Sequence, residues 1–252
     1  MRTRLFLLCV AALGVATTAF AQEDYHVEVG ATWCKPASPE IIASSGQLST
    51  SVDFINQFGV ADERFRGFKV TLKPGRKHKL RYSQTPIEYT GSATLTQRIT
   101  FRGQTFNVGV PTNASVKWTL QQFGYEWDPI STPVGYVGIF ADVKYNKLDA
   151  SLANAVRTES FTQNVPIPTI GGTARAYASK NASVTMEFTA FKWNNSSIDG
   201  KVYDFDIYGT AHLGRNLGAQ FGYRRLSADF AVDNDSGNLK LKGPYFGGVL
   251  RF

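Results

Sequence analysis

The sequence predicts an all-β protein, a single antiparallel transmembrane β-barrel of ten strands, with eight and twelve strands as the alternatives. Three observations support this fold class. Apolar and polar residues alternate with a period of two in ten segments, which is the pattern of a strand with a different medium on each face. Short and long connections alternate strictly between these segments, as expected for strands that cross a membrane back and forth. Beyond the N-terminal segment, no apolar run is long enough to cross a bilayer as a helix.

The composition agrees with a barrel. The chain contains 23 Gly, 18 Phe and 11 Tyr, which favours strands and tight turns over helices. Its mean hydropathy of −0.18 fits a barrel because only every second side chain of a strand faces lipid. The net charge of +7 suits contact with anionic lipid headgroups. A nucleic-acid partner is not expected, since the chain has an export signal and no basic cluster.

The N-terminal segment 1–21 predicts a cleavable signal peptide. Arg2 and Arg4 form a positive start, residues 5–15 form an apolar core, and the small residues Ala19 and Ala21 mark the cleavage site. The barrel domain is therefore expected to span 22–252. It retains one cysteine, Cys34, and one cysteine cannot form an internal disulfide.

Each strand is predicted from its alternating faces. In the first strand, 25–33, the odd-numbered residues from Tyr25 to Trp33 are apolar and face lipid. The other nine predicted strands are 68–72, 80–83, 116–127, 137–146, 170–177, 184–190, 203–213, 217–224 and 238–252. A girdle of aromatic residues at the membrane interfaces is expected from Tyr25, Trp33, Trp118, Trp127, Tyr203 and Phe252.

One strand changes its apolar face partway along. In 116–127 the even-numbered Trp118 belongs to the apolar set at first, and the odd-numbered Phe123 belongs to it afterwards. A slip of one residue turns every side chain to the opposite face, so the sequence predicts a β-bulge near Gln121 and Gln122.

The connections assign the two sides of the membrane. Four short ones are expected at 74–77, 128–132, 179–182 and 214–216, and five longer ones at 34–63, 91–112, 152–164, 194–200 and 233–237. The short turns and both termini are assigned to the periplasmic side, and the long loops to the cell surface. The first two loops contain further alternating stretches, 51–55 and 94–110, that could form hairpins above the membrane and account for the count of twelve.

The last strand ends on Phe252, with Leu250 and Phe246 on the same face. Together with the signal peptide and the pattern of strands and connections, this ending resembles the small outer-membrane β-barrel families of Gram-negative bacteria, and 51–59 resembles a loop of uncharacterised barrels of this kind. The resemblance implies an outer-membrane location among lipids that include lipopolysaccharide. It also implies that Phe246, Leu250 and Phe252 are the signal read by the outer-membrane insertion machinery. A monomer is favoured.

The predicted lumen is rich in charge. Its six acidic and five basic residues are Glu28, Glu126, Asp142, Glu187, Asp204 and Asp206, and Lys69, Arg81, Lys144, Arg175 and Arg224. Side chains nearly fill a barrel of eight to ten strands, so these charges are expected to pair and close the channel. The leading function is a closed structural or surface-interaction barrel with long extracellular loops. A narrow passive channel for small solutes is the alternative, and a lipid-modifying enzyme is a distant third.

No catalytic, cofactor-binding or metal-ligating residues are predicted. A hydrolytic site requires a nucleophile within hydrogen-bond reach of its base, but His26, His78 and His212 are all expected towards the periplasmic end. Asp204 and Asp206 share a face of one strand, but no histidine is expected beside them. The sequence contains no Cys/His cluster with the spacing of a metal site.

Overall fold

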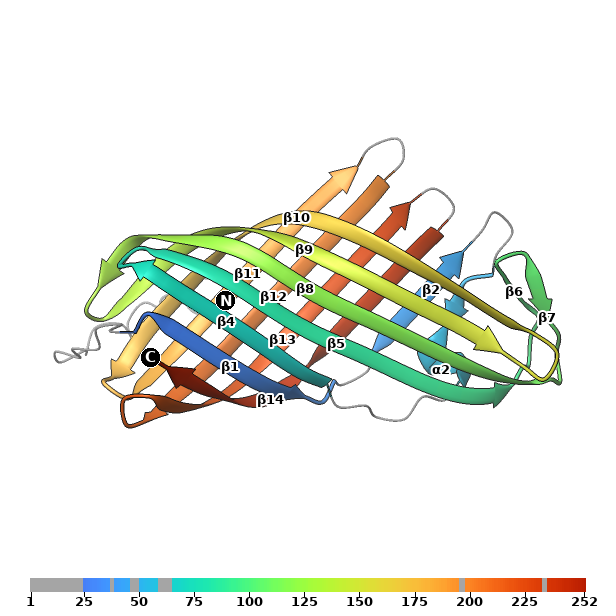
Figure 1. Cartoon of the computed structure of the whole chain (residues 1–252), viewed down its shortest axis with the longest axis horizontal. Helices are drawn as coiled ribbons and strands as arrows, with labels where there is room; N and C mark the ends of the chain where they lie inside the picture. The colour runs from blue at the N-terminus through green and yellow to red at the C-terminus, as the bar shows by residue number, and fades with distance from the viewer. Residues whose placement is uncertain (1–24, 37–38, 46–49, 59–64, 195–197, 233–234) are drawn as a thin grey trace, which may run out of the picture.

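The computed structural model describes residues 25–36, 39–45, 50–58, 65–194, 198–232 and 235–252. The predicted signal peptide lies outside these residues. The described chain is nearly all strand (Figure 1). It contains no helix that is both long and apolar enough to cross a membrane.

Ten strands form a closed antiparallel barrel, as predicted. In the order in which they pair, they are β1 (Val27–Cys34), β4 (Phe65–Gly75), β5 (His78–Thr94), β8 (Pro111–Thr132), β9 (Gly135–Ala153), β10 (Thr158–Ser179), β11 (Ala182–Asn194), β12 (Ile198–Leu213), β13 (Leu217–Val232) and β14 (Asp235–Arg251). Pairing of β1 with β14 closes the ring. The strands are strongly tilted, and both described termini lie at the same end of the barrel (Figure 1).

The connection between β1 and β4 extends the barrel wall at the end away from the termini. We call this end the outer half of the barrel, and the end that carries the termini the inner half. The first strand, β1, is only 8 residues long, whereas β8 and β10 have 22 each. Beyond the end of β1, β14 pairs instead with β2 (Glu40–Ser45), which pairs with β3 (Val52–Asp53). The short helix α2 (Phe54–Phe58) follows and lies against β2, β5 and β8. The carboxylate of Asp53 caps it by accepting the N–H groups of Ile55 and Asn56.

The second connection carries a separate hairpin, which the sequence also suggested. It consists of β6 (Ile99–Phe101) and β7 (Gln104–Phe106). Arg102 and Gly103 join them, with φ angles of 51° and 75°. A two-residue hairpin turn of type I′ requires positive φ at both positions, which explains the glycine.

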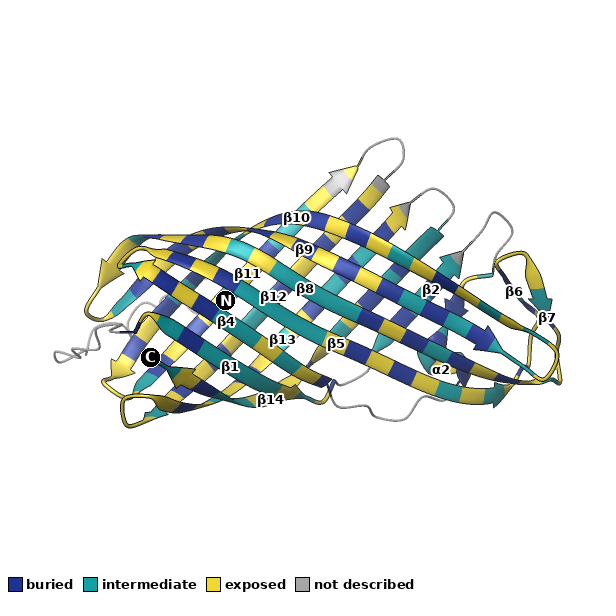
Figure 2. Ribbon diagram, viewed as in Figure 1, coloured by how far each residue is buried: buried dark blue, intermediate teal, exposed yellow. Residues whose placement is uncertain are grey.

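Each long strand reverses the polarity of its two faces along its length. In β9, every second residue from Tyr136 to Leu152 is buried inside the barrel without interruption. The outward face is apolar from Val137 to Tyr145 and then becomes polar, while the inward face changes from polar to apolar over the same stretch. Figure 2 shows buried and exposed residues alternating along the strands, with stretches of intermediate exposure in the middle of several. The inner half of the barrel therefore has the polarity of a membrane-spanning barrel, and the outer half has that of a water-soluble one.

The predicted bulge near Gln121 and Gln122 is wrong. β8 pairs with β9 in continuous register from Asn113 to Trp127, and its register shift lies beyond Trp127. The apolar residues change face because the medium outside the strand changes from lipid to water. The register of the strand stays the same. Trp118 therefore lies inside the barrel with 0% of its surface exposed.

The aromatic girdle needs two corrections. Trp33, Trp127, Tyr203 and Phe252 are exposed on the outer face as predicted. Trp118 belongs to the interior, and so does Tyr25. The Tyr25 ring is 6% exposed and packs against the guanidinium of Arg251 at 4.4 Å.

Two predicted connections are in fact strand. β8 continues through 128–132, and the turn follows at 133–134. Most of 152–164 also belongs to strands, since β9 ends at Ala153 and β10 begins at Thr158. The sequence rule expected strands only as long as the membrane is thick, but these strands continue beyond it.

Candidate functional site

The interior is the candidate functional site, and its inner half is a layer of paired charges. All eleven residues predicted for the lumen network occupy inward-facing strand positions here. We call this region the charged layer. It also contains residues that the sequence analysis did not assign to the network, namely Lys73, Lys79, Asp128, Tyr208, Tyr245 and Arg251.

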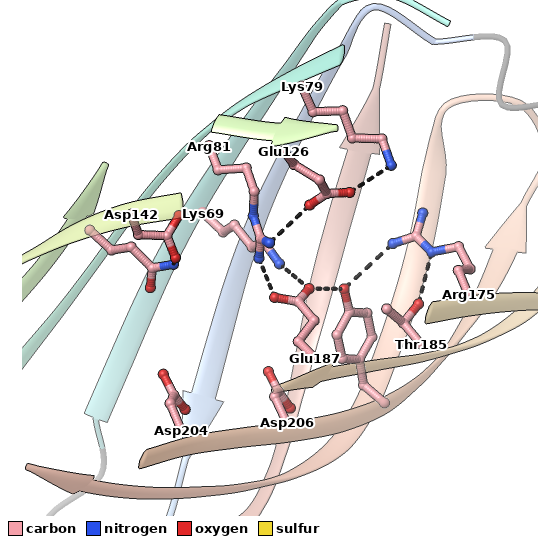
Figure 3. A network of polar contacts seen from close by, with 12 residues as sticks. Lys69, Lys79, Arg81, Glu126, Asp142, Arg175, Thr185, Glu187, Asp204 and Asp206 are labelled. Carbon is pink, nitrogen blue, oxygen red and sulfur yellow. Dashed lines mark hydrogen bonds and ion pairs between the residues drawn. The ribbon is translucent and has the colours of Figure 1, made fainter. Parts of the chain in front are cut away.

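Glu187 of β11 is the most connected acid of the charged layer (Figure 3). Its carboxylate accepts hydrogen bonds from Lys69 Nζ at 2.6 Å and from the Tyr208 hydroxyl at 2.9 Å. Arg81 of β5 donates one guanidinium nitrogen to Glu187 and the other to Glu126 Oε2, the latter at 2.9 Å. Arg81 thus joins the walls of the barrel across the lumen.

Lys79 connects the two acids of β8. Its Nζ lies 3.0 Å from Glu126 Oε1 and 2.9 Å from Asp128 Oδ2, and it stands 3.4 Å from the centroid of the Tyr136 ring. Lys79 is 1% exposed, so two carboxylates and an aromatic face replace its water shell. It follows His78 at the turn, where the predicted strand had not yet begun.

Asp204 is held by two cations. Arg224 donates to both of its oxygens, at 2.9 and 2.8 Å, and Lys144 Nζ donates to Oδ2 at 2.7 Å. Asp206 accepts a hydrogen bond from the Tyr245 hydroxyl at 2.9 Å. The two carboxylates therefore have different partners: Asp204 is ion-paired, and Asp206 is hydrogen-bonded to a neutral hydroxyl.

The remaining predicted charges lie around this centre. Glu28 pairs with Arg251 at 2.6 Å across the β1–β14 closure. Arg175 donates from Nε to the Thr185 hydroxyl at 2.8 Å. Asp142 accepts from the Gln122 side chain at 2.5 Å.

The outer half of the lumen contains an apolar core. Trp118 of β8 is its largest fully buried side chain, and it meets the ring of Phe230 on β13 edge-on at 5.6 Å. Phe54 and Phe58 of α2 enter the same core from the first connection, each 1% exposed. The other buried members include Ile41, Ile87, Ile99, Phe101, Phe106, Val116, Leu148, Leu152 and Leu239.

A cavity of about 130 Å³ lies within the charged layer and extends to the edge of the apolar core. Glu28, Glu187 and Asp206 line its polar side, and Phe65 and Leu226 lie on its apolar side. A buried water requires roughly 10–15 Å³ of such space, so the cavity has room for several waters. A second space of about 20 Å³ lies nearby.

Outside the apolar core, the barrel wall is polar. Lys117 of β8 donates to Glu88 of β5 at 2.9 Å, and both side chains are 56% exposed. The hydrogen bond and the charge of Glu88 raise the pKa of Lys117. Such an exposed pair contributes little to stability.

Within the described part of the chain, none of the three histidines hydrogen-bonds to or pairs with an acid of this interior network. His78 lies at the β4–β5 turn and shares a hydrogen bond of 2.5 Å with the Tyr125 hydroxyl. His212 lies next to the β12–β13 turn, and His26 lies just before β1. All three are thus at the end of the barrel that carries the termini, as predicted. Among the described residues, no group of three His, Cys, Asp or Glu side chains is arranged to hold a metal ion.

No protein-family model matches the sequence, and no curated protein matches it either. Solved structures do resemble the fold. The outer-membrane protease OmpT from Escherichia coli is 9% identical with a TM-score of 0.59, and the match covers 94% of this chain and 99% of that one. The translocator domain of the autotransporter NalP from Neisseria meningitidis is 12% identical with a TM-score of 0.47, covering 99% and 94%. The attachment protein Ail of Yersinia pestis is 9% identical with a TM-score of 0.42, covering 90% and 99%. Such identities establish the fold alone, and this chain has the fold of the Gram-negative outer-membrane β-barrels.

Proposed function

We propose that this chain is an integral outer-membrane barrel with a closed interior, and that it acts as a structural or surface-interaction protein. The observation that carries the proposal is that two different sets of side chains occupy successive parts of the lumen. The charged layer occupies the inner half and the apolar core occupies the outer half. A solute on its way through would have to displace both.

The charged layer and the apolar core oppose the passage of solutes through different interactions. In the charged layer, Arg81 and Glu187 connect opposite walls, and separating such a pair leaves uncompensated charge. In the apolar core, contacts such as Trp118 against Phe230 offer a passing polar solute no hydrogen-bond partner. Burial of an unpaired polar group is costly, so each layer is a barrier to the solutes that the other would tolerate.

The proposed location in the outer membrane rests on the apolar residues of the barrel's outward face. Phe246, Leu250 and Phe252 are 60%, 42% and 63% exposed on one face of the closing strand, which continues the apolar band around the barrel. We assign these three residues the role of the assembly signal, as their sequence pattern suggested. The same band would contact the acyl chains of outer-membrane lipids.

The proposed surface role rests on the tip of the outer half. Arg157, between β9 and β10, donates to the Gln104 side chain of the β6–β7 hairpin at 2.9 Å, and Arg102 of the hairpin donates to the Ser160 carbonyl at 3.2 Å. These bonds tie two connections together. Val156 beside them is 82% exposed. A firm tip with exposed apolar and cationic groups suits contact with another surface.

An osmotic swelling assay tests the closed interior. Liposomes containing the purified full-length protein should swell in a small sugar at the rate of protein-free liposomes. A protein-dependent swelling rate would favour the narrow channel, and the cavity within the charged layer would then be part of its path.

Replacement of the β6–β7 hairpin by a short turn tests the surface role separately. The barrel should remain folded in the outer membrane, and the adhesion of expressing cells to host or bacterial surfaces should fall. Unchanged adhesion, with the barrel folded at normal levels, would contradict a role for this tip.

A further inference from the structure

On one side of the barrel, a row of cations with no ion-pair partner among the described residues follows the edge of the lipid-facing apolar band. Each of the four consecutive strands β11 to β14 carries a lysine or an arginine on its outward face. On each strand, moving away from the termini, this cation lies one or two outward-facing positions beyond the last large lipid-facing residue. All four cations are exposed, and we call them the cationic ridge: Lys192, Lys201, Arg225 and Lys242.

The register places these cations directly opposite one another in pairs. Lys192 of β11 faces Lys201 of β12, and Arg225 of β13 faces Lys242 of β14. Residues directly opposite on antiparallel strands have Cβ atoms about 4.5–5.5 Å apart, and like charges there destabilise the sheet. The two pairs are offset along the strands, since Lys201 lies opposite Asp229 and Arg225 lies opposite Phe205. An anion over either pair relieves the repulsion within it.

The ridge cations form no close ion pairs with the described acids on this side. Among the described residues, none of the four ridge cations has an ion pair within 4.0 Å. Asp229 lies opposite Lys201 in the register and accepts a hydrogen bond from Asn238. Lys201 stands 5.1 Å from the centroid of the Tyr203 ring.

The opposite side of the barrel provides an internal comparison. There Lys117 is paired with Glu88 at 2.9 Å, and Lys147 is paired with Asp149 at 3.5 Å. The cations at a comparable level on β8 and β9 are thus compensated by the protein. The four ridge cations lie on β11–β14, which are neighbours in the barrel wall (Figure 1). Lys240 of β14, by contrast, is paired with Glu40 at 2.9 Å.

We propose that the cationic ridge is a binding site for the phosphate groups of an anionic outer-leaflet lipid. The inference rests on the proposed membrane location, because it requires the apolar band to lie among acyl chains. Tyr203 and Tyr223, the lipid-facing residues just inside the ridge, then lie at headgroup level, where tyrosine is favoured. A phosphorylated lipid places its chains on the band and its phosphates between Arg225 and Lys242. Arginine binds phosphate through two parallel hydrogen bonds, and lysine binds it as a point charge.

Lipid binding to the purified full-length protein in a nonionic detergent tests this site. Native mass spectrometry would count bound bisphosphorylated lipid A, and lipid A without its phosphates would serve as the comparison ligand. The test variant is Arg225→Gln/Lys242→Gln. The matched control is Lys117→Gln/Lys147→Gln, which removes the same charge from the opposite side. Each cation near an anionic lipid surface strengthens binding severalfold. We therefore expect the test variant to bind the lipid about tenfold more weakly than the unmodified protein. The affinity of the control variant should change less than twofold.

Each other outcome would overturn the inference. Equal weakening in both variants would show general charge attraction, and equal binding of the dephosphorylated lipid would show that acyl chains alone are recognised. Binding of inorganic phosphate, or of a soluble anionic polysaccharide, in place of the lipid would assign the ridge to another ligand. None of these results depends on whether the lumen conducts, so a failure here is distinct from a failure of the closed-barrel proposal.

Discussion

The indole Nε1 of Trp118 donates a hydrogen bond of 3.3 Å to Oδ1 of Asn146, inside the barrel where β8 and β9 run side by side. Trp118 belongs to the apolar core, and Asn146 is the last inward polar residue of β9 before Leu148. The Asn146 amide also donates to the backbone carbonyl of Lys144 at 3.1 Å. This bond therefore marks the boundary between the two fillings of the lumen.

The position of Trp118 gives the first prediction. Trp118→Ala should lower the free energy of unfolding by about 3–5 kcal/mol, the usual cost of removing a large aromatic side chain from a core. Trp127→Ala on the outer face, where Trp127 is 42% exposed, should cost less. Urea unfolding in lipid vesicles followed by fluorescence measures both. A larger cost for Trp127→Ala would place Trp118 at the membrane surface, as the sequence pattern alone suggested.

The reversal of face polarity gives the second prediction, using two outward positions of β9. Ile139→Arg should cost about 2–4 kcal/mol if residue 139 lies near the bilayer midplane. Ser151→Arg, on the same face but in the outer half, should be nearly neutral because an arginine there is hydrated. Unfolding free energies in vesicles of defined lipid compare the two variants. Equal costs would mean that the membrane band extends along the whole strand.

The connections of Glu187 give the third prediction. Glu187→Gln removes the charge that faces both Lys69 and Arg81, and should destabilise the barrel by about 3 kcal/mol or more, since breaking a buried pair leaves a charge without its partner. Glu88→Gln, which breaks the exposed pair with Lys117, should change stability little, because water screens exposed ion pairs. Similar values for the two variants, measured by urea titration, would indicate that water fills the charged layer.

The terminal residue gives the fourth prediction. Deletion of Phe252 should reduce the amount of folded protein in the outer membrane of growing cells, while protein refolded from urea into vesicles should keep its stability. Fractionation of cells and heat-dependent gel mobility measure the two effects. Removal of Leu213, which is 69% exposed near the β12–β13 turn, by Leu213→Ser serves as a control for lost apolar surface. Normal outer-membrane levels without Phe252 would contradict its role as the assembly signal.

The alternation of residues was sufficient to predict the ten strands and which face of the membrane-spanning half points inward. Period two is a local property, and it survives whatever the chain does beyond the membrane. The inward placement of Glu187, Asp204 and Arg224 follows from it directly. Arg251 carried the same signal, since it stands between the outward-facing Leu250 and Phe252, but the sequence analysis did not include it.

The inward and outward faces of the outer half were assigned wrongly because lipid was assumed to surround the whole length of each strand. After Asn146, β9 continues with Leu148 and Leu152 on the inward positions and Lys147 and Asp149 on the outward ones. A change from polar to apolar residues along the same face of one strand indicates that the strand leaves the bilayer. Which acid pairs with which base could not be predicted, because Arg81 and Glu187 are 106 residues apart and meet only when the barrel closes.

Single-channel recording across planar bilayers tests the central claim most directly, namely that the charged layer and the apolar core close the lumen. The purified, unmodified protein should insert without producing steady unitary conductance steps, because ions meet both layers in series. Stable and reproducible conductance steps, at protein levels where insertion is verified independently, would contradict the closed barrel and favour the narrow channel.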